Sequence, residues 1–508
     1  MGVFLVDVAL ALALLYIPSI AIYRLYFHPL ARFPGPTVAA LTRYFEAYYD
    51  VICGGQYTFK IDELHKKYGN LRPPSLCPHE LHVNDPAFFK QLYRQDGRWD
   101  KYGWTITPFG LPSATIHSLD SHEHRRRRAA LNPFFSKANV VHKQHVIETM
   151  TSKLCHRLRT LPEGVEMNLG NAISALTRDI ATETIIGGSF NHLDVEDFHA
   201  DLATLQQNIG GIWRTTKHIR WYGPLLESIP MSILDKIGDN GLKTFLSYTE
   251  ASRKFPILTS KLADSSFPLG PGDTAHTIVH QMLASDLPPS DKTFEHLSHE
   301  VATVTTAAME TTAHSIRVTI YHLFKNLSML SQLREELASS GVNLDLGAEG
   351  INLARLEALP YFTAVLMEGL RLSTPISSRS QRIAPDRDIW YGEWRIPAGT
   401  PVGMTLLLMH QDERLYPEPK KFEPRRWLDS SGAIKRVDQG YEPFGRGTRN
   451  CLGMYLAWAE LYIIIAVLVQ GFDFRLDGVG PEDVEAASDK FITATARQNG
   501  FKALVKAR

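Results

Sequence analysis

A glycine-rich turn that holds one cysteine is the feature that most constrains what this chain can fold into. The turn reads Phe-Gly-Arg-Gly-Thr-Arg-Asn-Cys-Leu-Gly over residues 444–453, and an apolar stretch from Met454 to Val469 follows directly. That stretch is typical of a buried helix, so Cys451 is expected just before a helix N-terminus, where unpaired N–H groups favour a thiolate over a thiol. A lone thiolate held in this way is suited to be the axial ligand of a haem iron.

The other residues of the turn have separate expected roles. Gly447 permits a backbone angle that a residue with a Cβ resists, and Gly453 lets the helix lie close to a flat ligand. Phe444, next to Gly445, is expected to pack over the sulfur, and Arg449 to bind a propionate carboxylate. The competing interpretation is a buried cysteine at an ordinary helix start, which leaves the spacing of Phe, Gly, Arg, Cys and Gly in the turn to chance.

These ten residues resemble the cysteine-ligand loop of the cytochrome P450 family. The resemblance implies haem b bound through Cys451, which would be the metal ligand. It also implies a mainly α fold with small β-sheets, in which the haem lies between a long oxygen-binding helix and the helix after the cysteine loop. Further motifs of the same family are then expected elsewhere in the chain.

Glu368 and Arg371 stand three residues apart in an apolar run, so they share one face of a predicted helix. An isolated pair of this kind is usually a weak surface ion pair. Downstream, residues 422–427 resemble the family's P-E-R-F segment, with Trp427 where the family often has Phe. The resemblance implies a buried structural triad of Glu368, Arg371 and Arg426, from which the loss of one partner is costly.

Another helix is predicted from about residue 291 to residue 323. One face of it carries small side chains, at Val304, Ala307, Ala308, Thr311 and Ser315. Taken alone, such a face is typical of a core helix, but residues 307–312 resemble the family's oxygen-binding A-G-x-E/D-T-T segment. The resemblance implies that Ala307 and Ala308 lie against the haem, that Thr311 hydrogen-bonds dioxygen, and that Glu310 delivers protons through water. Ala308 stands where the family usually has glycine, and its extra methyl is expected either to narrow the oxygen groove or to reduce a helix kink.

Four consecutive arginines follow His124. They do not predict nucleic-acid binding, because the formal net charge of the chain is zero and no second basic cluster supports it. The segment resembles the family's helix C, with His124 in the place usually held by Trp. By this resemblance His124 and Arg128 bind one haem propionate and Arg382 binds the second. The remaining arginines are expected to face solvent, on the side where the family docks its reductase.

Two further patterns concern redox and metal chemistry. The four cysteines, at positions 53, 77, 155 and 451, have no paired spacing, so no disulfide framework is predicted, as in a reducing compartment. His296 and His299 have i, i+3 spacing beside acidic residues but match no zinc motif. A solvated helix start is the preferred interpretation of this histidine pair.

The N-terminal residues, Val3 to Tyr23, are almost wholly apolar and number about the ~20 that a membrane-spanning helix needs. A cleaved signal peptide is the competing interpretation, but a basic start and a clear cleavage site are absent from the sequence. Arg24, His28 and Arg32 follow, which places the C-terminal side in the cytosol. The layout resembles single-pass members of the family in the endoplasmic reticulum membrane.

Three segments are predicted. Residues 1–23 form the membrane anchor, 24–39 a basic and proline-rich hinge, and 40–508 one haem-binding domain, because no linker or repeat divides it. Strands are expected near 79–83, 388–396 and 491–506. The family usually has a first strand near 69–77, but Pro73 and Pro74 oppose one here.

The resemblance implies a haem-thiolate monooxygenase that hydroxylates or epoxidises an apolar small molecule. Electrons are expected from NADPH through a separate flavoprotein reductase, with cytochrome b5 as a further possible donor. The segments Phe-His-Pro-Leu at 27–30, Phe-Pro-Gly-Pro at 33–36 and Phe-Phe-Ser-Lys at 134–137 look like those of filamentous-fungal members of the trichodiene oxygenase kind. This resemblance suggests a terpenoid or another secondary metabolite as substrate. The candidate substrate-pocket residues, besides Ala307 and Ala308, are Trp104, Phe109, Val304, Ile376 and Thr493. Two alternatives stay open: an oxygen-independent isomerase, dehydratase or peroxygenase, and a membrane-anchored haem protein without turnover.

Overall fold

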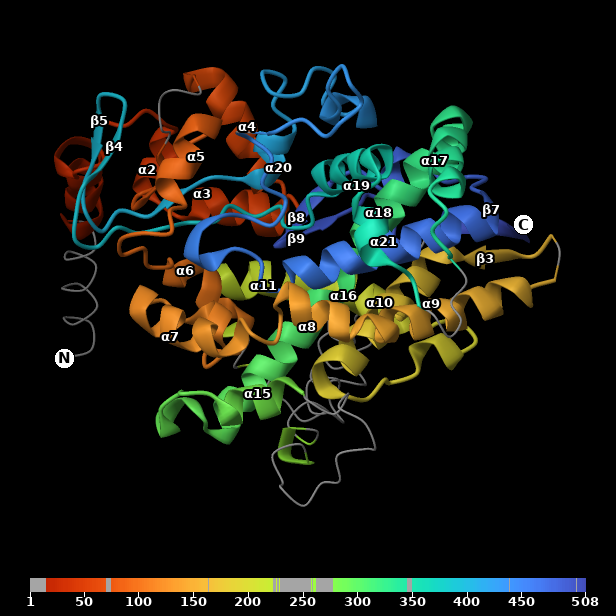
Figure 1. Cartoon of the computed structure of the whole chain (residues 1–508). Helices are drawn as coiled ribbons and strands as arrows, with labels where there is room; N and C mark the ends of the chain where they lie inside the picture. The colour runs from red at the N-terminus through yellow and green to blue at the C-terminus, as the bar shows by residue number, and fades with distance from the viewer. Residues whose placement is uncertain are drawn as a thin grey trace.

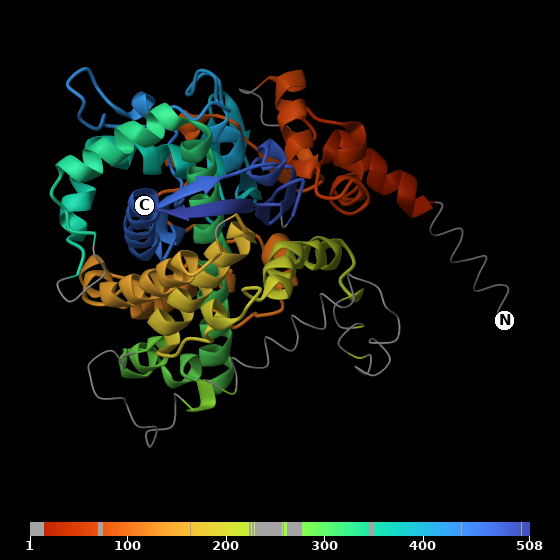
Figure 2. The ribbon, with the colours of Figure 1, turned by 90° about the vertical axis from the view of Figure 1, so that its right-hand side faces the viewer.

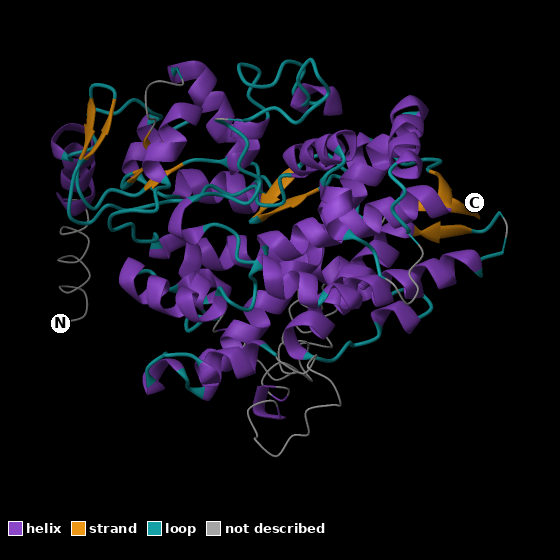
Figure 3. Ribbon diagram, in the orientation of Figure 1, coloured by secondary structure: helices purple, strands orange, loops and turns teal. Residues whose placement is uncertain are grey.

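A computed structural model of the chain describes residues 15–69, 75–162, 164–222, 277–344, 350–437, 439–498 and 500–508, with residues 225, 228, 257 and 259–261 between them. Helices make up most of it, and small sheets lie between and beside them (Figures 1 and 3). Most of the expected membrane span, residues 1–14, lies outside the described residues, and so do the two prolines at 73 and 74.

The long helices of the body are α4 (Tyr57–Tyr68), α7 (Ser121–Leu131), α9 (Gln144–Arg159), α10 (Leu169–Ile186), α11 (Ala200–His218), α16 (Phe294–Lys325), α17 (Leu327–Ser339), α19 (Pro360–Ser373) and α21 (Met454–Gly471). The shorter α-helices are α2 (Thr37–Leu41), α3 (Tyr44–Ala47), α5 (Pro86–Leu92), α6 (Gly103–Ile106), α8 (Lys137–His142), α15 (Ile278–Ala284), α18 (Leu353–Glu357) and α20 (Leu406–His410). Single-turn helices include η1 (Tyr23–Phe27), η2 (Tyr48–Ile52), η3 (Thr107–Phe109), η4 (Thr115–His117), η5 (His192–Asp194), η7 (Pro289–Asp291), η8 (Pro424–Trp427), η9 (Gly447–Arg449) and η10 (Pro481–Asp483).

The core of the molecule forms where α16 crosses α10, α19 and α21 (Figures 1 and 2). Helix α16 begins at a cap in which the Thr293 side chain accepts a hydrogen bond from the His296 N–H. The predicted helices at 291–323 and 454–469 are thus confirmed within a few residues. Among the described residues, α21 alone is long and apolar enough to cross a membrane, but most of it is buried in the body, which makes it a core helix.

Four small sheets surround this helical core. One contains β1 (Ser75–Cys77), β2 (Glu80–His82) and β6 (Val402–Gly403), and another contains β3 (Glu166–Asn168), β10 (Lys502–Ala507) and β7 (Phe472–Arg475). Two antiparallel hairpins complete the set: β4 (Ile389–Tyr391) with β5 (Trp394–Ile396), and β8 (Ser488–Lys490) with β9 (Ile492–Ala494).

The strands expected near 79–83, 388–396 and 491–506 are confirmed, whereas β3, β6 and β7 were not expected. The first strand is present as β1, since Ser75 pairs with Leu81 directly after the two prolines. Proline blocks a strand only where its missing N–H is needed, so a strand can begin just past it. The two prolines therefore do not prevent a strand from beginning at Ser75.

One expectation about α16 is wrong. His296 is 1% exposed, so the histidine pair at 296 and 299 does not form a solvated helix start. Burial is the main cause that lowers the pKa of His296 to about 4, and the positive charge of Arg127 acts in the same direction.

Candidate haem site

The cysteine turn is fixed by its own backbone. The Cys451 N–H donates to the Phe444 carbonyl at 2.8 Å, and η9 fills the turn between them. Gly447 has a φ of +79°, and a Cβ there would meet the Arg94 carbonyl oxygen at 2.7 Å. Only glycine tolerates both the left-handed angle and this close approach. The turn is therefore held against the chain segment that follows α5.

The remaining turn residues lie as follows. The Phe444 ring is partly buried and packs on Trp458 of α21, with ring centroids 5.9 Å apart. Gly445 also has a positive φ, of +67°. Gly453 comes directly before α21. Apart from its neighbours in the chain, no atom of the described residues lies within 4 Å of the position that a Cβ would take there. A flat ligand could therefore approach the start of α21 closely.

Cys451 is accessible, while the chain encloses the space around its sulfur. That burial raises the pKa of the thiol above its ordinary value, and the Gly453 backbone N–H and the charge of Arg128 only partly oppose it. A metal ligand must be deprotonated, so metal binding would have to displace this proton.

Helix α16 presents a narrow accessible face. Ala307 is exposed, and Val304, Ala308 and Thr311 are half-buried. The Thr311 hydroxyl donates to the Ala307 carbonyl at 2.8 Å. Ser315 departs from the prediction, since it is buried and shares a hydrogen bond of 3.0 Å with the Ser373 hydroxyl. The accessible face thus ends at Thr311.

Four cations gather around His124, and together they form what we call the cation cluster: Lys101, Arg128, Arg382 and Arg449. Burial, followed by the positive charges of all four, lowers the pKa of His124 to about 2. Burial and the charge of Arg382 also lower the pKa of Arg449 to about 9, and burial lowers the pKa of Lys101 well below its usual range. Buried cations are depressed in this way where anionic partners are too few to offset desolvation.

The side chains of the cation cluster bind mostly backbone oxygens. Arg449 donates to the Ser118 carbonyl at 2.8 Å, and its buried Nε lacks a partner among the described residues. Arg128 donates to the Asn450 carbonyl at 3.0 Å, beside Cys451. Lys101 was missed by the sequence analysis, because a single lysine in a loop matches no motif.

The residues present fit an iron porphyrin with two carboxylates. Cys451 offers the sulfur ligand, and the cation cluster offers charge-assisted hydrogen bonds for the propionates. Arg382 is buried, with its guanidinium 4.9 Å from the ring centre of Tyr93, and donates to the Gln381 carbonyl. Carboxylates at this place would relieve the repulsion within the cation cluster.

One expectation about the arginine run is corrected. Arg127 does not face solvent, since it forms ion pairs with Asp291 at 3.0 Å and with Glu123 at 2.9 Å. Arg126 joins Asp291 at 2.8 Å. Much of the run therefore ties α7 to η7 instead of forming a free basic surface. Arg125 alone of these three is exposed and forms no ion pair among the described residues.

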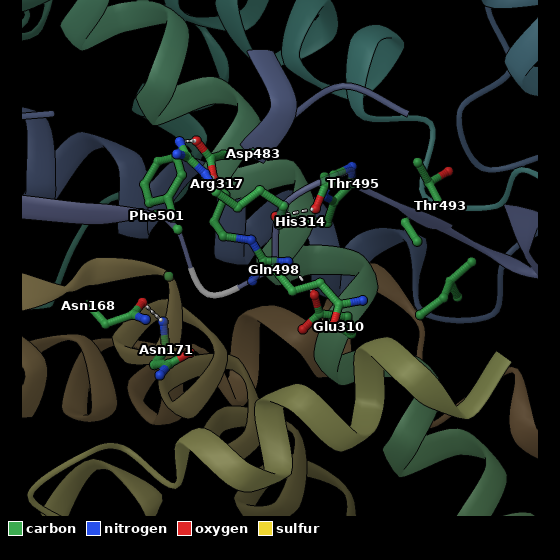
Figure 4. A pocket seen from close by; sticks show the side chains of 15 residues that line it. Asn168, Asn171, Glu310, His314, Arg317, Asp483, Thr493, Thr495, Gln498 and Phe501 are labelled. Atoms are coloured by element: carbon green, nitrogen blue, oxygen red, sulfur yellow. Dashed lines mark hydrogen bonds and ion pairs between the residues drawn. The ribbon is translucent and has the colours of Figure 1, made fainter. Parts of the chain in front are cut away.

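Glu310 lies on α16 next to Thr311 but has different neighbours. Its carboxylate forms an ion pair with Arg317 and accepts a hydrogen bond of 3.2 Å from Ser174 of α10. Arg317 also donates to the Ser174 hydroxyl at 2.8 Å. The carboxylate lines a small polar cavity (Figure 4).

The predicted triad is assembled around Glu368, which is fully buried. Its carboxylate accepts from Arg371 at 2.8 and 2.9 Å and from Arg426 at 3.0 Å. The Trp427 indole N–H donates to the same carboxylate at 2.9 Å, and the Glu423 backbone N–H at 3.0 Å. Trp427 was noted only as a departure from Phe, whereas its N–H adds a donor that Phe lacks.

The candidate substrate-pocket residues do not all meet. Phe109 of η3 contacts Phe491 at 4.7 Å and Trp213 at 5.8 Å between ring centroids, and neither partner was foreseen. Trp104 lies instead against the guanidinium groups of two arginines. Thr493 is buried, and its hydroxyl donates to the Thr374 carbonyl at 2.6 Å.

Ile376 lies close to the same hairpin, because it forms an isolated β-bridge with Ile492. Phe491, at the tip of the hairpin, has a φ of +70°, which is rare for a residue with a Cβ. Its N–H donates to Asp489 at 2.8 Å. Such a fixed, unusual conformation is common at ligand-binding positions, but the sequence gives no sign of it.

Comparisons with known proteins agree with this site. A model of the cytochrome P450 family matches residues 48–499. The chain is 36% identical to the cytochrome P450 monooxygenase MO6277 of Ascocoryne sarcoides, over 97% of each chain. It is 34% identical to a tryptophan 6-hydroxylase of Fusarium equiseti, over 93% of this chain and 91% of the relative. It is 31% identical to the cytochrome P450 monooxygenase TRI4 of Fusarium sporotrichioides, over 96% and 92%.

The chain therefore belongs to the cytochrome P450 family. It is an oxidoreductase of the monooxygenase class, its cofactor is haem, and its relatives are fungal enzymes. The resemblance in the cysteine turn is thus confirmed at the level of the family.

Proposed function

We propose that this protein is a membrane-anchored monooxygenase that inserts one oxygen atom of dioxygen into an apolar small molecule, by hydroxylation or epoxidation. Electrons come from NADPH through a separate flavoprotein reductase, and cytochrome b5 is a second donor. The observation that carries the proposal is the accessible thiol of Cys451 together with the cation cluster and the accessible face of α16. Haem, when bound, supplies the oxygen chemistry, and the chain orients the reactants and excludes water.

The substrate we propose is a terpenoid or another apolar secondary metabolite. The supporting observation is the aromatic contact of Phe109, Trp213 and Phe491, which come from three separate elements. Aromatic walls bind apolar ligands through buried area and offer few polar anchors. The alternative without dioxygen is disfavoured by the Glu310–Thr311 pair next to the accessible face.

The proposal is tested by the spectrum of the reduced protein with carbon monoxide. The full chain, expressed in microsomes and reduced with dithionite, is expected to give the strongly red-shifted Soret band of a thiolate-ligated haem. Cys451→Ser is expected to lose that band, whereas Cys155→Ser, a change at another cysteine far along the chain, is expected to keep it. A wild-type band at the position of neutral-ligand haem would contradict the assignment of Cys451.

The pocket assignment needs its own measurement. Candidate terpenoids are titrated into the ferric protein while the Soret band is followed. Ala307→Phe and Ile376→Trp are expected to weaken the spectral response by at least about tenfold, because a bulky side chain displaces ligand atoms. Thr306→Ser, on the same helix, serves as the control. An unaltered response in both bulky variants would show that the substrate binds elsewhere.

A further inference from the structure

A polar cavity of about 30 Å³ lies behind α16, on the side where Glu310 meets α10. It is lined from several elements: α10, α16, and the segment between β9 and β10 (Figure 4). The polar side chains that matter to the argument are Asn171, Glu310, His314, Arg317 and Gln498. A cavity needs about 10–15 Å³ to hold one water molecule and two to four polar partners for it, so this cavity has room for one or two waters.

The cavity reaches the surface on the side lined by the segment between β9 and β10. Arg497, one of its lining residues, is exposed, while Asn171 at the inner side is buried. Thr311, by contrast, lies on the accessible face of α16 and does not line the cavity. Glu310 is therefore the lining residue that adjoins Thr311 in sequence and can connect the two sides of the helix.

His314 is the unexplained group in this cavity. It is 5% exposed, and its Nε2 is buried without a hydrogen-bond partner among the described residues. The ring is bonded to the Ser373 carbonyl, and since Nε2 has no partner, Nδ1–H is the donor. Nε2 then carries a lone pair. Burial and the charge of Arg317 lower the pKa of His314 to about 3, so the imidazole stays neutral and Nε2 stays a hydrogen-bond acceptor. A buried acceptor without a partner costs about 1–3 kcal/mol, which a bound water would offset.

The carboxylate of Glu310 is held in place by Arg317 and by Ser174 of α10. Arg317 pairs with it, and the Ser174 hydroxyl accepts from Arg317 and donates to Glu310. Glu310, His314 and Arg317 lie on successive turns of α16, at i, i+4 and i+7, so they share one face of the helix. The carboxylate and the imidazole thus line the same water-sized space.

We propose that this cavity holds the water that returns a proton to Glu310 during oxygenation, and that His314 is the positioning residue that orients this water through Nε2. The inference rests on the proposed function and extends it to residues outside the oxygen-binding segment. Protons then enter past Arg497, which is exposed, and Gln498, on the side of the cavity away from the inner residue Asn171.

The proton balance is as follows. One turnover consumes dioxygen, two electrons from the reductase and two protons, and it yields one oxygen atom in the product and one water. Each proton that leaves the Glu310 carboxyl group toward Thr311 leaves a carboxylate behind. The cavity water donates a proton to that carboxylate and takes one from bulk water in its turn. His314 accepts a hydrogen bond throughout and does not change its own charge.

The first test is structural and does not depend on turnover. A crystal structure of the full chain, or of its soluble body, at a resolution that shows ordered water is expected to place a water within about 3.2 Å of both His314 Nε2 and a Glu310 oxygen. In His314→Phe this water is expected to be absent. A dry cavity in the wild type, or a protein group bound to Nε2, would overturn the proposal.

The second test is kinetic and needs no known substrate. The full chain, in phospholipid vesicles with a P450 reductase and NADPH, is assayed for hydrogen peroxide released per NADPH consumed. His314→Phe is expected to raise this ratio toward its stoichiometric limit of one peroxide per NADPH, because oxygen reduction without timely protonation releases peroxide. His314→Gln keeps a group that can hold the water and is expected to restore most of the wild-type ratio.

His322→Phe is the matched control, since His322 is a further histidine of α16 with a lowered pKa but stacks on Phe422 away from the cavity. Equal ratios in His314→Phe and His322→Phe would refute the role of His314. A wild type that consumes no dioxygen with NADPH and reductase would refute the proposed function instead. The crystal structure would still decide whether a water binds to both His314 and Glu310.

Discussion

Trp427 shows how a single departure from a family pattern can strengthen a buried network. Its indole N–H is one of five donors to the Glu368 carboxylate, with Arg371 giving two of the others. A buried carboxylate is tolerated only when its lone pairs are occupied. The side chain at position 427 is therefore part of the charge balance of the triad as well as of its packing.

Trp427→Phe is expected to lower the free energy of unfolding by about 2 kcal/mol, the usual worth of a hydrogen bond to a charged group. Denaturant unfolding of the haem-loaded protein measures it. Trp390→Phe is the control, because Trp390 is 55% exposed and its loss should cost no more than about 0.5 kcal/mol. Equal losses for the two variants would mean that the indole N–H contributes nothing to the triad.

Thr311 provides the second residue-scale prediction. Thr311→Ala removes the hydroxyl on the accessible face of α16, so peroxide released per NADPH is expected to rise close to its stoichiometric limit of one. Thr306→Ala is a close control, since Thr306 makes the same kind of bond to a carbonyl four residues back, at 2.7 Å. Stability should change equally little in both. If Thr306→Ala uncoupled as strongly as Thr311→Ala, the hydroxyl at 311 would have no special role.

Residue types and spacings predict those sites whose partners are local in sequence or fixed by a motif. The Glu368–Arg371 pair and the cysteine turn are of this kind. Lys101 and the buried environment of His296 could not be predicted, because both depend on segments that meet only in the folded chain. The upward shift of the Cys451 pKa could not be predicted either, since its largest cause is burial in the folded chain.

At the scale of elements, α11 is fastened to the N-terminal segment by a buried ion pair network. Lys217, near the end of α11, lies 2.8 Å from Glu46 of α3 and 2.5 Å from Asp50 of η2, and its side chain is 1% exposed. Arg379 also binds Glu46, at 2.7 Å. Burial by itself would raise the pKa of Glu46, but these two cations outweigh it and hold that pKa far below its usual range.

Lys217→Met should therefore be severe. It leaves two carboxylates buried with too few partners, and breaking a buried pair in this way costs about 3–5 kcal/mol. Lys420→Met breaks only an exposed pair with Glu485 and should cost about 0–1 kcal/mol. Denaturant unfolding at neutral pH compares the two. A loss at Lys217 no larger than that at Lys420 would show that the network is not closed in solution.

The same network predicts a dependence on pH. The pKa values of Glu46 and Asp50 are both lowered in the folded protein, from ordinary values of 4.5 and 3.8. A lowered pKa gives stability that is complete above the ordinary value and is lost as pH falls toward the folded one. The free energy of unfolding should thus decline below about pH 4.5, and less steeply in Glu46→Gln/Asp50→Asn. Parallel pH profiles for wild type and double variant would contradict this.

The long helices were predictable because their apolar periodicity extends over many residues, as in α16 and α21. The short strands were harder, since β3 and β7 are only three and four residues long and both form by pairing with β10. For β3 this partner comes from the far end of the chain. The tip of the β8–β9 hairpin was missed as a pocket element for the same reason. Its position depends on Asp489, whose carboxylate accepts from Ser377 and Ser378.

At the scale of the whole molecule, the N-terminal residues differ in character from the body. Figure 2 shows the first described residues standing away from the body. Leu15, Tyr16 and Ile17 are 70%, 65% and 63% exposed. Leu30 and Phe33, in contrast, are 5% exposed and belong to a core cluster with strand and loop residues of the body. The border between the proposed anchor and the folded body therefore lies between these two groups.

This border makes the proposed membrane anchor testable by two truncations. A chain that begins at residue 24 loses the exposed apolar segment and keeps Leu30 and Phe33, so carbonate extraction should move it from the membrane pellet to the supernatant while its carbon monoxide spectrum is retained. A chain that begins at residue 35 also loses both buried side chains, at about 1.5–3 kcal/mol each, and should unfold more readily and hold less haem. If the chain from residue 24 stayed in the pellet, the body itself would hold the membrane and the anchor assignment would fail. If both truncated chains were equally stable, the segment from 24 to 34 would be a linker, as the predicted hinge implies, and the packing of Leu30 and Phe33 would carry no weight in the fold.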